Sequence, residues 1–225
     1  MWCVGELDAE YVERMEDLLD LYERPLDPEE PVVCVDEKPV QLLAETRDAT
    51  PPGCGRIAKR DFEYRRCGTA NIFAAVEPKA GRHMPRVTRD RKAPRFAEEL
   101  LEIALAYPDA RTIHLVLDNL NTHSRASVER AYGEEHAQRL WRRFTIHYTP
   151  KHGSWLNQAE IALGLISREA LGKSRIETRG EMRAIVAAWG REATKARRVI
   201  GWHFTTSAAR KKFGYESKIM SRPRH

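Results

Sequence analysis

The sequence predicts an α/β protein whose mixed β-sheet is flanked by helices on both faces, and two observations lead to this fold class. Short apolar, β-branched runs separated by turn residues dominate residues 32–88, which favours a hairpin-rich beginning. From residue 94 onward, helical patterns alternate with short apolar strands, which favours parallel pairing in a sheet covered on both sides. With 225 residues, of which 42% are hydrophobic, the chain can form one sizeable core.

The first expected element is a helix over residues 8–24, where tyrosine, methionine and leucine side chains recur at helical intervals. Asp8 can cap its first turn, and Pro25, Pro28 and Pro31 then end the helix and stiffen the segment that follows. We therefore expect an acidic helix and a proline-rich linker ahead of the sheet.

Apolar runs predict strands at residues 32–35, 40–44, 69–76, 82–88, 112–117 and 144–148. The first run is expected to end at Asp36, with the second as its hairpin partner, and residues 47–68 are expected to form a loop. Helical patterns predict helices at residues 94–107, 125–141, 155–171 and 179–197, with Ser154 as the cap of the third.

Charge is distributed unevenly along the chain, whose formal net charge is +5 and whose pI is about 9.1. Residues 1–30 contain 11 acidic and two basic residues, a net charge of −9, which leaves +14 for the rest. Residues 171–225 contain 14 basic and four acidic residues, and a second basic stretch runs from Arg82 to Arg95. Such stretches can follow a phosphate backbone, although a solvated surface explains them equally well.

The cysteines and the apolar runs bear on the cellular compartment. Cys3, Cys34, Cys54 and Cys67 include no CxxC pair, which disfavours a zinc ribbon and a disulfide framework. The first ten residues do not resemble a secretory signal, and no apolar run is long enough to span a bilayer. We therefore expect a cytoplasmic protein without a membrane partner.

Three acidic residues are candidates for chemistry. Asp36 follows the run VVCV and Asp118 follows HLVL, so each lies where an apolar strand leaves the core, a common place for ligand sites. Glu160 falls at the margin of the apolar face of the helix expected from Trp155. Taken singly, each aspartate also suits a turn and the glutamate a solvated surface. Taken together, the oxygen-rich trio suits two Mg²⁺ or Mn²⁺ ions in phosphoryl transfer.

The segments VCVDEKP, LVLDNLNTH and HYTPKHGSWLNQAEI contain these acids and resemble the three catalytic blocks of bacterial insertion-sequence transposases in the mariner-like superfamily. The resemblance runs from about residue 10 to about residue 215 and includes the segment GWHFT near Trp202. It implies a ribonuclease H-like fold with a mixed five-stranded sheet, and a DDE triad formed by Asp36, Asp118 and Glu160.

The same resemblance implies an activity, its cofactors and its partners. Such a transposase cleaves the phosphodiester bond at a transposon end to leave a 3′-hydroxyl, which then attacks target DNA, and two Mg²⁺ or Mn²⁺ ions serve as cofactors. The implied partner is double-stranded DNA, both transposon ends and target, bound by a homodimer that associates with the bacterial nucleoid.

Polar residues after the second acid are candidates for DNA contacts. Asn119, Asn121 and His123 follow Asp118 on what we expect to be an active-site loop, where they could contact a phosphate or position water. Turn formation is an equal alternative, because asparagine favours turns.

The segment before the third acid offers further candidates. Lys151 and His152 precede the expected helix, whose N-terminus would attract a DNA phosphate. Asn157 lies one turn before the glutamate and can orient it or contact DNA. Trp155 and Trp202 are predicted to belong to the core rather than to stack on bases.

The resemblance also sets the expected domains: an acidic helix and linker over residues 1–30, a DDE catalytic domain over residues 31–215, and a basic tail over residues 216–225. Family members usually carry helix-turn-helix modules before the core, and we expect these to be missing because the chain begins almost at the core. The 41 residues between Asp118 and Glu160 exceed the usual spacing, which indicates a surface insertion. Two alternatives stay open: a nuclease or resolvase that cuts without joining, and an inactive DNA-binding remnant.

Overall fold

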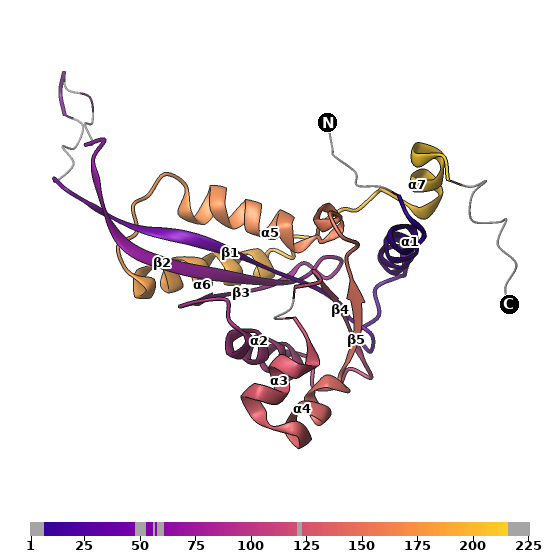
Figure 1. Cartoon of the computed structure of the whole chain (residues 1–225). Helices are drawn as coiled ribbons and strands as arrows, with labels where there is room; N and C mark the ends of the chain where they lie inside the picture. The colour runs from indigo at the N-terminus through magenta and orange to yellow at the C-terminus, as the bar shows by residue number, and fades with distance from the viewer. Residues whose placement is uncertain (1–6, 48–52, 56, 58–60, 121–122, 216–225) are drawn as a thin grey trace, which may run out of the picture.

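The computed structural model describes residues 7–47, 53–55, 57, 61–120 and 123–215. Its centre is a five-stranded sheet with the strand order β3-β2-β1-β4-β5 (Figure 1). The strands are β1 (Val32–Glu45), β2 (Tyr64–Glu77), β3 (Arg82–Thr88), β4 (Ile113–Leu117) and β5 (Phe144–Tyr148). β1, β2 and β3 pair antiparallel in succession, whereas β4 pairs parallel with both β1 and β5. The predicted mixed sheet, hairpin-rich at first and parallel later, is therefore confirmed.

β1 is longer than predicted. The segments 32–35 and 40–44 are not hairpin partners but parts of one strand, which continues through Asp36. Its partner β2 begins at Tyr64, inside the expected loop. Proline has no backbone N–H to donate a hydrogen bond to a neighbouring strand, so it is tolerated where one edge of a strand is unpaired. Because β1 pairs with β4 over three residues near its start, its later part has such an edge, which accommodates Pro39.

Helices cover both faces of the sheet, as predicted. One face, called here the α2 face, carries α2 (Ala93–Ala106), α3 (Arg125–Tyr132) and α4 (Glu134–Trp141) (Figure 1). The opposite α5 face carries α1 (Ala9–Glu23), α5 (Ala159–Leu165) and α6 (Arg179–Lys195). Successive strand residues point to opposite faces, so Cys34 belongs to the core of the α5 face, whereas Val33 and Val35 belong to the core of the α2 face.

Two predicted helices are interrupted. The helix expected over residues 125–141 is divided into α3 and α4 at Gly133, whose φ of 79° lies in a region that favours glycine. The helix expected from Trp155 begins late, because a 3₁₀ turn, η1 (Ser154–Leu156), is followed by extended Asn157 before α5 starts. α5 then continues into a π-helical segment, η2 (Ile166–Leu171). Ser154 is therefore not the cap of this helix.

The acidic N-terminal helix packs against the body of the protein. Asp8 caps α1 by accepting a hydrogen bond from the Tyr11 N–H at 2.7 Å, as predicted. Beside α1 lies α7 (Thr206–Phe213), a helix that the sequence pattern did not predict (Figure 1). Arg210 of α7 donates to both carboxylate oxygens of Glu16, at 2.7 and 2.9 Å. The acidic helix thus pairs with a basic segment of the same chain.

The domain boundaries remain predictions. The apolar side chains of α1 join the same core as the α5 face of the sheet, so this helix is packed against the sheet rather than separate from it. Residues 216–225, the predicted tail, lie outside the described residues. Within the described ranges, no helix combines the length and the apolar character needed to cross a membrane.

Candidate active site

Strand register brings Asp36 and Asp118 to the same part of the sheet. β1 and β4 run parallel with Cys34 opposite Val116, and each aspartate lies two residues further along the chain. Alternate residues of a strand share a face, so Asp36 lies on the α5 face with Cys34. Asp118 directly follows the last residue of β4. Asp36 is therefore inside a strand rather than at its end, but it is still level with the end of β4.

A buried asparagine brings the third acid to this position. Asn157 is 2% exposed and donates a hydrogen bond from Nδ2 to the carbonyl of Val35 at 2.8 Å, next to Asp36. Its Oδ1 accepts from the Ala159 N–H at 3.1 Å, and its carbonyl accepts from the Glu160 N–H at 3.1 Å. The start of α5 is thus attached to β1. Of the two predicted roles, orienting the glutamate agrees with this geometry, and contact with DNA stays a prediction for a side chain that is largely buried and hydrogen bonded.

Asp36 interacts electrostatically with the other two acids. Burial raises the pKa of Asp36 to about 7, and the hydrogen bond from the Glu37 N–H at 2.8 Å opposes this increase. The negative charges of Glu37, Asp118 and Glu160 raise this pKa further. Charges shift a carboxyl pKa in this way when they lie near it. The three acids singled out in the sequence therefore lie in one electrostatic environment.

These acids have the oxygen donors that a hard divalent cation prefers, although their side chains are not arranged as a complete coordination site. Mg²⁺ and Mn²⁺ prefer carboxylate oxygens, and a cation would offset the repulsion that raises the pKa of Asp36. Among the described residues, no three His, Cys, Asp or Glu side chains are arranged to hold an ion. Asp118 explains part of this, because its Oδ1 is hydrogen bonded to Nδ1 of His123. The residues therefore fit the cation by their donor chemistry.

His123 is a buried partner of Asp118 rather than a DNA contact. Its side chain is 1% exposed, with Nδ1 against Asp118 and Nε2 at 3.4 Å from Oε2 of Glu37. Burial lowers the pKa of His123, but the hydrogen bond with Asp118 and the nearby carboxylate of Glu37 together outweigh it and raise the pKa to about 9. The imidazole also packs on Phe96, with 4.6 Å between ring centroids. The predicted DNA contact is wrong because no face of this ring reaches the surface.

Glu37 belongs to the site but was missed in the sequence. It follows Asp36 in β1, so its side chain points to the opposite, α2 face, where it is 2% exposed beside His123. Nη1 of Arg91 lies 3.6 Å from Oε1 of Glu37 and supplies a positive charge. The available signal was the pair of adjacent acids after VVCV, since in a strand one of the two must face the interior.

A polar pocket of about 830 Å³ opens beside Asp118. Its polar lining includes Arg14, Asn119, Lys151 and His152. Lys151 and His152 are exposed, and His152 has a left-handed backbone with a φ of 62°. The reason given for their phosphate contact does not hold as predicted, because only the short 3₁₀ turn η1 follows them and α5 begins at Ala159. Their position beside Asp118 gives a different reason to propose that contact.

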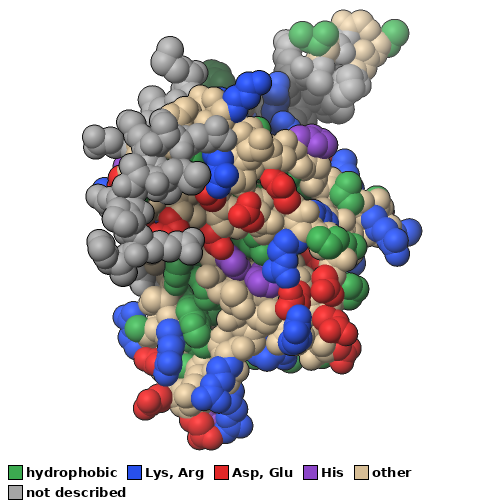
Figure 2. Space-filling view, turned by 90° about the vertical axis from the view of Figure 1, so that its right-hand side faces the viewer, with side chains coloured by type: hydrophobic (Ala, Val, Ile, Leu, Met, Phe, Trp, Pro, Cys, Tyr) green, Lys and Arg blue, Asp and Glu red, His purple; other side chains and the backbone are tan. Residues whose placement is uncertain are grey.

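Charges of both signs are interspersed on the side of the molecule that carries α1 and β5. Figure 2 shows Lys and Arg side chains among Asp and Glu on this face, rather than one continuous basic surface. One such pair joins Arg14 and Glu10 at 2.6 Å on α1. A DNA contact on this side would therefore depend on local groups such as Lys151. Asn121, another predicted contact, lies outside the described residues.

A second pocket, of about 630 Å³, opens beside Glu160 and is called here the aromatic pocket. It is lined by Trp155, Asn157, Glu160, Ile161, Trp202, Phe204, Lys212 and Phe213. Trp155 and Trp202 pack against the core of the α5 face while remaining partly exposed. Their predicted place in the core is confirmed, and both rings also form part of this open pocket.

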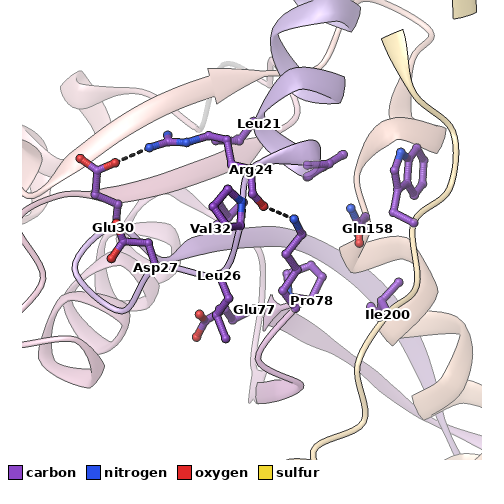
Figure 3. Close-up of a pocket in the computed structure, with 14 residues that line it drawn as sticks. Leu21, Arg24, Leu26, Asp27, Glu30, Val32, Glu77, Pro78, Gln158 and Ile200 are labelled. Atoms are coloured by element: carbon purple, nitrogen blue, oxygen red, sulfur yellow. Dashed lines mark hydrogen bonds and ion pairs between the residues drawn. The ribbon is translucent and has the colours of Figure 1, made fainter. Parts of the chain in front are cut away.

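A small cavity lies where the end of α1 meets Val32 and Ile200 (Figure 3). Its volume is about 50 Å³, little more than the roughly 30 Å³ that one molecule of liquid water occupies. Arg24 pairs with Glu30 at its edge, and the Arg24 carbonyl accepts a hydrogen bond from Lys79. None of the three acids lines this cavity, so we regard it as a gap in the packing of α1.

Comparison with known proteins adds independent evidence. A family model described as DDE superfamily endonuclease matches residues 31–183. Among curated proteins, no sequence matches this chain.

Solved structures of the Mos1 mariner transposase resemble the fold. The Mos1 mariner paired-end complex with Mn has a TM-score of 0.58 at 15% identity, covering 97% of this chain and 66% of that chain. A pre-cleavage Mos1 transpososome has a TM-score of 0.58 at 16% identity with the same coverage. The Mos1 strand transfer complex has a TM-score of 0.54 at 14% identity and covers 90% of this chain. The predicted ribonuclease H-like fold is confirmed, and this chain spans 66% of the length of those proteins.

Proposed function

Because this chain belongs to the DDE superfamily endonuclease family, we propose that it is the catalytic domain of a transposase that cleaves one DNA strand and joins it to another. Asp36, Asp118 and Glu160 are its proposed catalytic carboxylates. The observation that carries the proposal is geometric: the register of β1 and β4 puts Asp36 and Asp118 at the same level of the sheet. Asn157 attaches the start of α5, which carries Glu160, to the carbonyl beside Asp36. We propose that these three acids, from separate parts of the chain, form one site, and the match to a DDE endonuclease family supports this proposal.

Each acid has its own positioning contact. The Glu37 N–H donates to Asp36, His123 holds Asp118, and Asn157 fixes the backbone of Glu160. Positioned groups are what phosphoryl transfer requires, because most of its catalysis comes from orientation and electrostatic stabilisation. These contacts support a working site rather than the inactive remnant.

We propose two Mg²⁺ or Mn²⁺ ions as cofactors, held by Asp36, Asp118 and Glu160. Bound ions would supply activation of the attacking oxygen and stabilisation of the leaving oxygen. Asp36 is the proposed shared residue, because its pKa responds to both of the other acids. Complexes of Mos1 mariner have been solved with Mn and with Mg, which agrees with a preference for such ions.

The proposed partner is double-stranded DNA, as transposon ends and as target, and the proposed assembly is a homodimer on that DNA in the bacterial cytoplasm. In the polar pocket, Lys151 and His152 are placed to contact the phosphate backbone beside Asp118, with Asn119 as a hydrogen-bonding neighbour. Asn121 remains a proposed contact from the sequence alone. The Mos1 complexes contain transposon-end DNA, which makes the same class of partner reasonable here.

The central test is the substitution Asp118→Asn, measured as Mg²⁺-dependent nicking of plasmid DNA. We expect a loss of roughly 10³-fold or more, which corresponds to about 4 kcal/mol of the barrier. Binding to DNA in EDTA should stay unchanged. The matched control is Asp109→Asn, an exposed aspartate in the turn before β4, which should cut like the wild type. Equal nicking by the Asp118→Asn protein would refute the assignment.

A second measurement separates a transposase from a nuclease or resolvase. A duplex with a precut 3′-hydroxyl end is offered together with a supercoiled target, and joined products are scored. Joining by the wild type and not by the Asp118→Asn protein supports strand transfer. Cutting without any joining supports the nuclease alternative.

A further inference from the structure

β3 is the outer strand of the sheet on the side away from the proposed catalytic acids, and α6 covers only part of its outer edge. The N–H of His83 donates to Oγ1 of Thr194 on α6 at 2.9 Å, and the same hydroxyl donates to the carbonyl of His83 at 3.0 Å. Both backbone groups of His83 therefore point away from β2. Alternate residues of an antiparallel strand direct these groups to the same edge, so the backbones of Pro85 and Val87 also face outward.

The uncovered part of this edge forms one wall of a pocket between α2 and α6, called here the edge pocket, with a volume of about 730 Å³. Residues 85–89 line it from β3 and the segment that follows. Within the described part of the chain, no hydrogen bond joins the outward N–H and carbonyl of Val87 to another element. A strand edge with unpaired backbone groups is a template on which a further strand can pair.

The edge pocket also contains positive charges that the protein itself does not balance. Arg86 and Arg95 pair with acids of α2. Arg89, Arg179 and Arg183 are exposed and line the pocket without an ion-pair partner among the residues that the structure describes. We propose that the edge pocket binds an extended acidic segment of a partner protein, which adds to the sheet as a strand beside β3.

The two faces of an added strand meet different surfaces. The side chain of Val87 belongs to the core of the α5 face, which α6 covers, whereas Arg86 points to α2 on the other face. Because successive side chains of a strand alternate between faces, every second side chain of the partner lies toward Arg179 and Arg183. The others lie toward Leu101 of α2. The edge pocket therefore fits a segment in which acidic residues alternate with apolar ones.

The lining of the edge pocket favours a peptide over the phosphate backbone of DNA. Glu98 and Glu102 of α2 line the same pocket as the arginines. A strand can direct its acids toward α6 and away from these two, whereas a phosphate backbone carries a charge on every unit. A peptide backbone can also pair with Val87, as in other proteins that bind a peptide by strand addition. None of the three proposed catalytic acids lines the pocket, so the inference does not rest on the proposed function.

The first test is a charge swap between the protein and a peptide. The probes are two capped fluorescent peptides of about six residues, one in which valine alternates with glutamate and one in which valine alternates with lysine. Anisotropy titrations compare the wild type with Arg183→Glu. We expect this variant to bind the glutamate peptide roughly 10-fold or more weakly than the wild type does, and to bind the lysine peptide more tightly.

The matched control is Arg191→Glu, which changes an exposed arginine of the same helix that does not line the edge pocket. It should bind the glutamate peptide like the wild type. Equal affinities of Arg183→Glu and Arg191→Glu for this peptide would overturn the proposal, as would a wild type that binds neither peptide.

The second test measures backbone pairing, which attraction between charges alone does not require. In a strand, the N–H groups of alternate residues point to opposite edges. Two further versions of the glutamate peptide carry N-methyl groups, one on its glutamates and one on its valines. We expect one of them to bind roughly 10-fold more weakly than the other, because only one set of N–H groups faces β3. Equal affinities of the two would mean that no strand pairs at this edge, and the proposal would be wrong.

Duplex DNA is the competing ligand, and the same proteins are titrated with a fluorescent duplex in EDTA. If Arg183→Glu weakens binding of the duplex while the wild type binds no peptide, the arginines contact DNA and the proposal is wrong. The Asp118→Asn protein should bind the glutamate peptide like the wild type. If it does so and also nicks normally, the proposed function fails and the peptide site stands. If nicking is lost but no protein binds the peptide, the peptide site fails and the catalytic assignment stands.

Discussion

Asp36 and Glu99 are two carboxyls of the same chain whose pKa values are raised to about 7, chiefly by burial and in part by neighbouring acids, but an arginine acts on the pKa of Glu99 alone. Glu99 lies on α2 with its side chain 1% exposed, and Arg86 Nε approaches its Oε2 at 3.3 Å and lowers its pKa. The side chains that shift the pKa of Asp36 are all acidic. A carboxyl group with a raised pKa is therefore not in itself evidence of an active site.

The difference lies in where the compensating cation comes from. Arg86 belongs to the fold and also pairs with Glu98 at 3.2 Å and with Glu102 at 3.7 Å, so a cation of the chain itself offsets part of the charge of this acidic group. At Asp36 every side chain that shifts the pKa is acidic, which is a condition that favours binding of a cation from solution. The comparison can be tested at both positions.

The largest expected effect is on stability at Glu99. A folded-state pKa of about 7, above the ordinary 4.5, means that its contribution is favourable below about pH 4.5 and is lost as the pH rises through 7. Glu99→Gln removes the charge, so it should raise the free energy of unfolding at pH 8 by up to about 3 kcal/mol. Urea denaturation at pH 8 and at pH 4.5 measures this, and the gain should largely vanish at the lower pH. A gain that does not depend on pH would contradict the assigned cause.

A slightly smaller effect is expected from metal at Asp36. Mg²⁺ at about 100 times its dissociation constant contributes about 2.7 kcal/mol to stability, which is roughly 5–10 °C in Tm. Thermal denaturation with and without Mg²⁺ should show this increase for the wild type and for Glu99→Gln, but not for Asp36→Asn. If Mg²⁺ raises the Tm of all three proteins, the ion binds elsewhere. The proposed difference between Asp36 and Glu99 as cation sites would then be wrong.

The smallest effect concerns the positioning of Asp118. Loss of a residue that orients a metal ligand typically weakens metal binding by roughly 10- to 100-fold. His123→Gln should reduce Mg²⁺ affinity within this range, as measured by calorimetry, and leave DNA binding in EDTA unchanged. His123→Asn should lose less, because its amide lies near the position of Nδ1, the atom that contacts Asp118. If both variants bind Mg²⁺ like the wild type, His123 has a purely structural role.

Much of the fold could be predicted because it depends on local patterns. β3 and β5 have the predicted bounds, since each is an apolar run between turn residues, and Asp8 caps α1 as expected. Local patterns failed where pairing between distant segments decides the structure. The segments 32–35 and 40–44 were predicted as two strands, but pairing with the long strand β2 makes them one continuous strand, β1.

The candidate site likewise has residues that local sequence identified and residues whose roles depend on distant segments. Local sequence identified Asp36, Asp118 and Glu160, because acids after apolar strands and in a family-like block are visible without a structure. It also gave DNA contact as one role of Asn157 and of His123, because the local sequence does not indicate whether a polar residue near an acid will be buried.

The sequence by itself determined which residues carry the charge, which segments become strands and helices, and which family the chain resembles. Tertiary structure alone decided that Asn157 joins α5 to β1, that Glu37 and His123 support Asp118 from the opposite face, and that aromatic rings from residues 155–213 meet beside Glu160. The physical reason is that burial and hydrogen bonding of these side chains depend on segments far apart in the chain, whose approach no local pattern encodes.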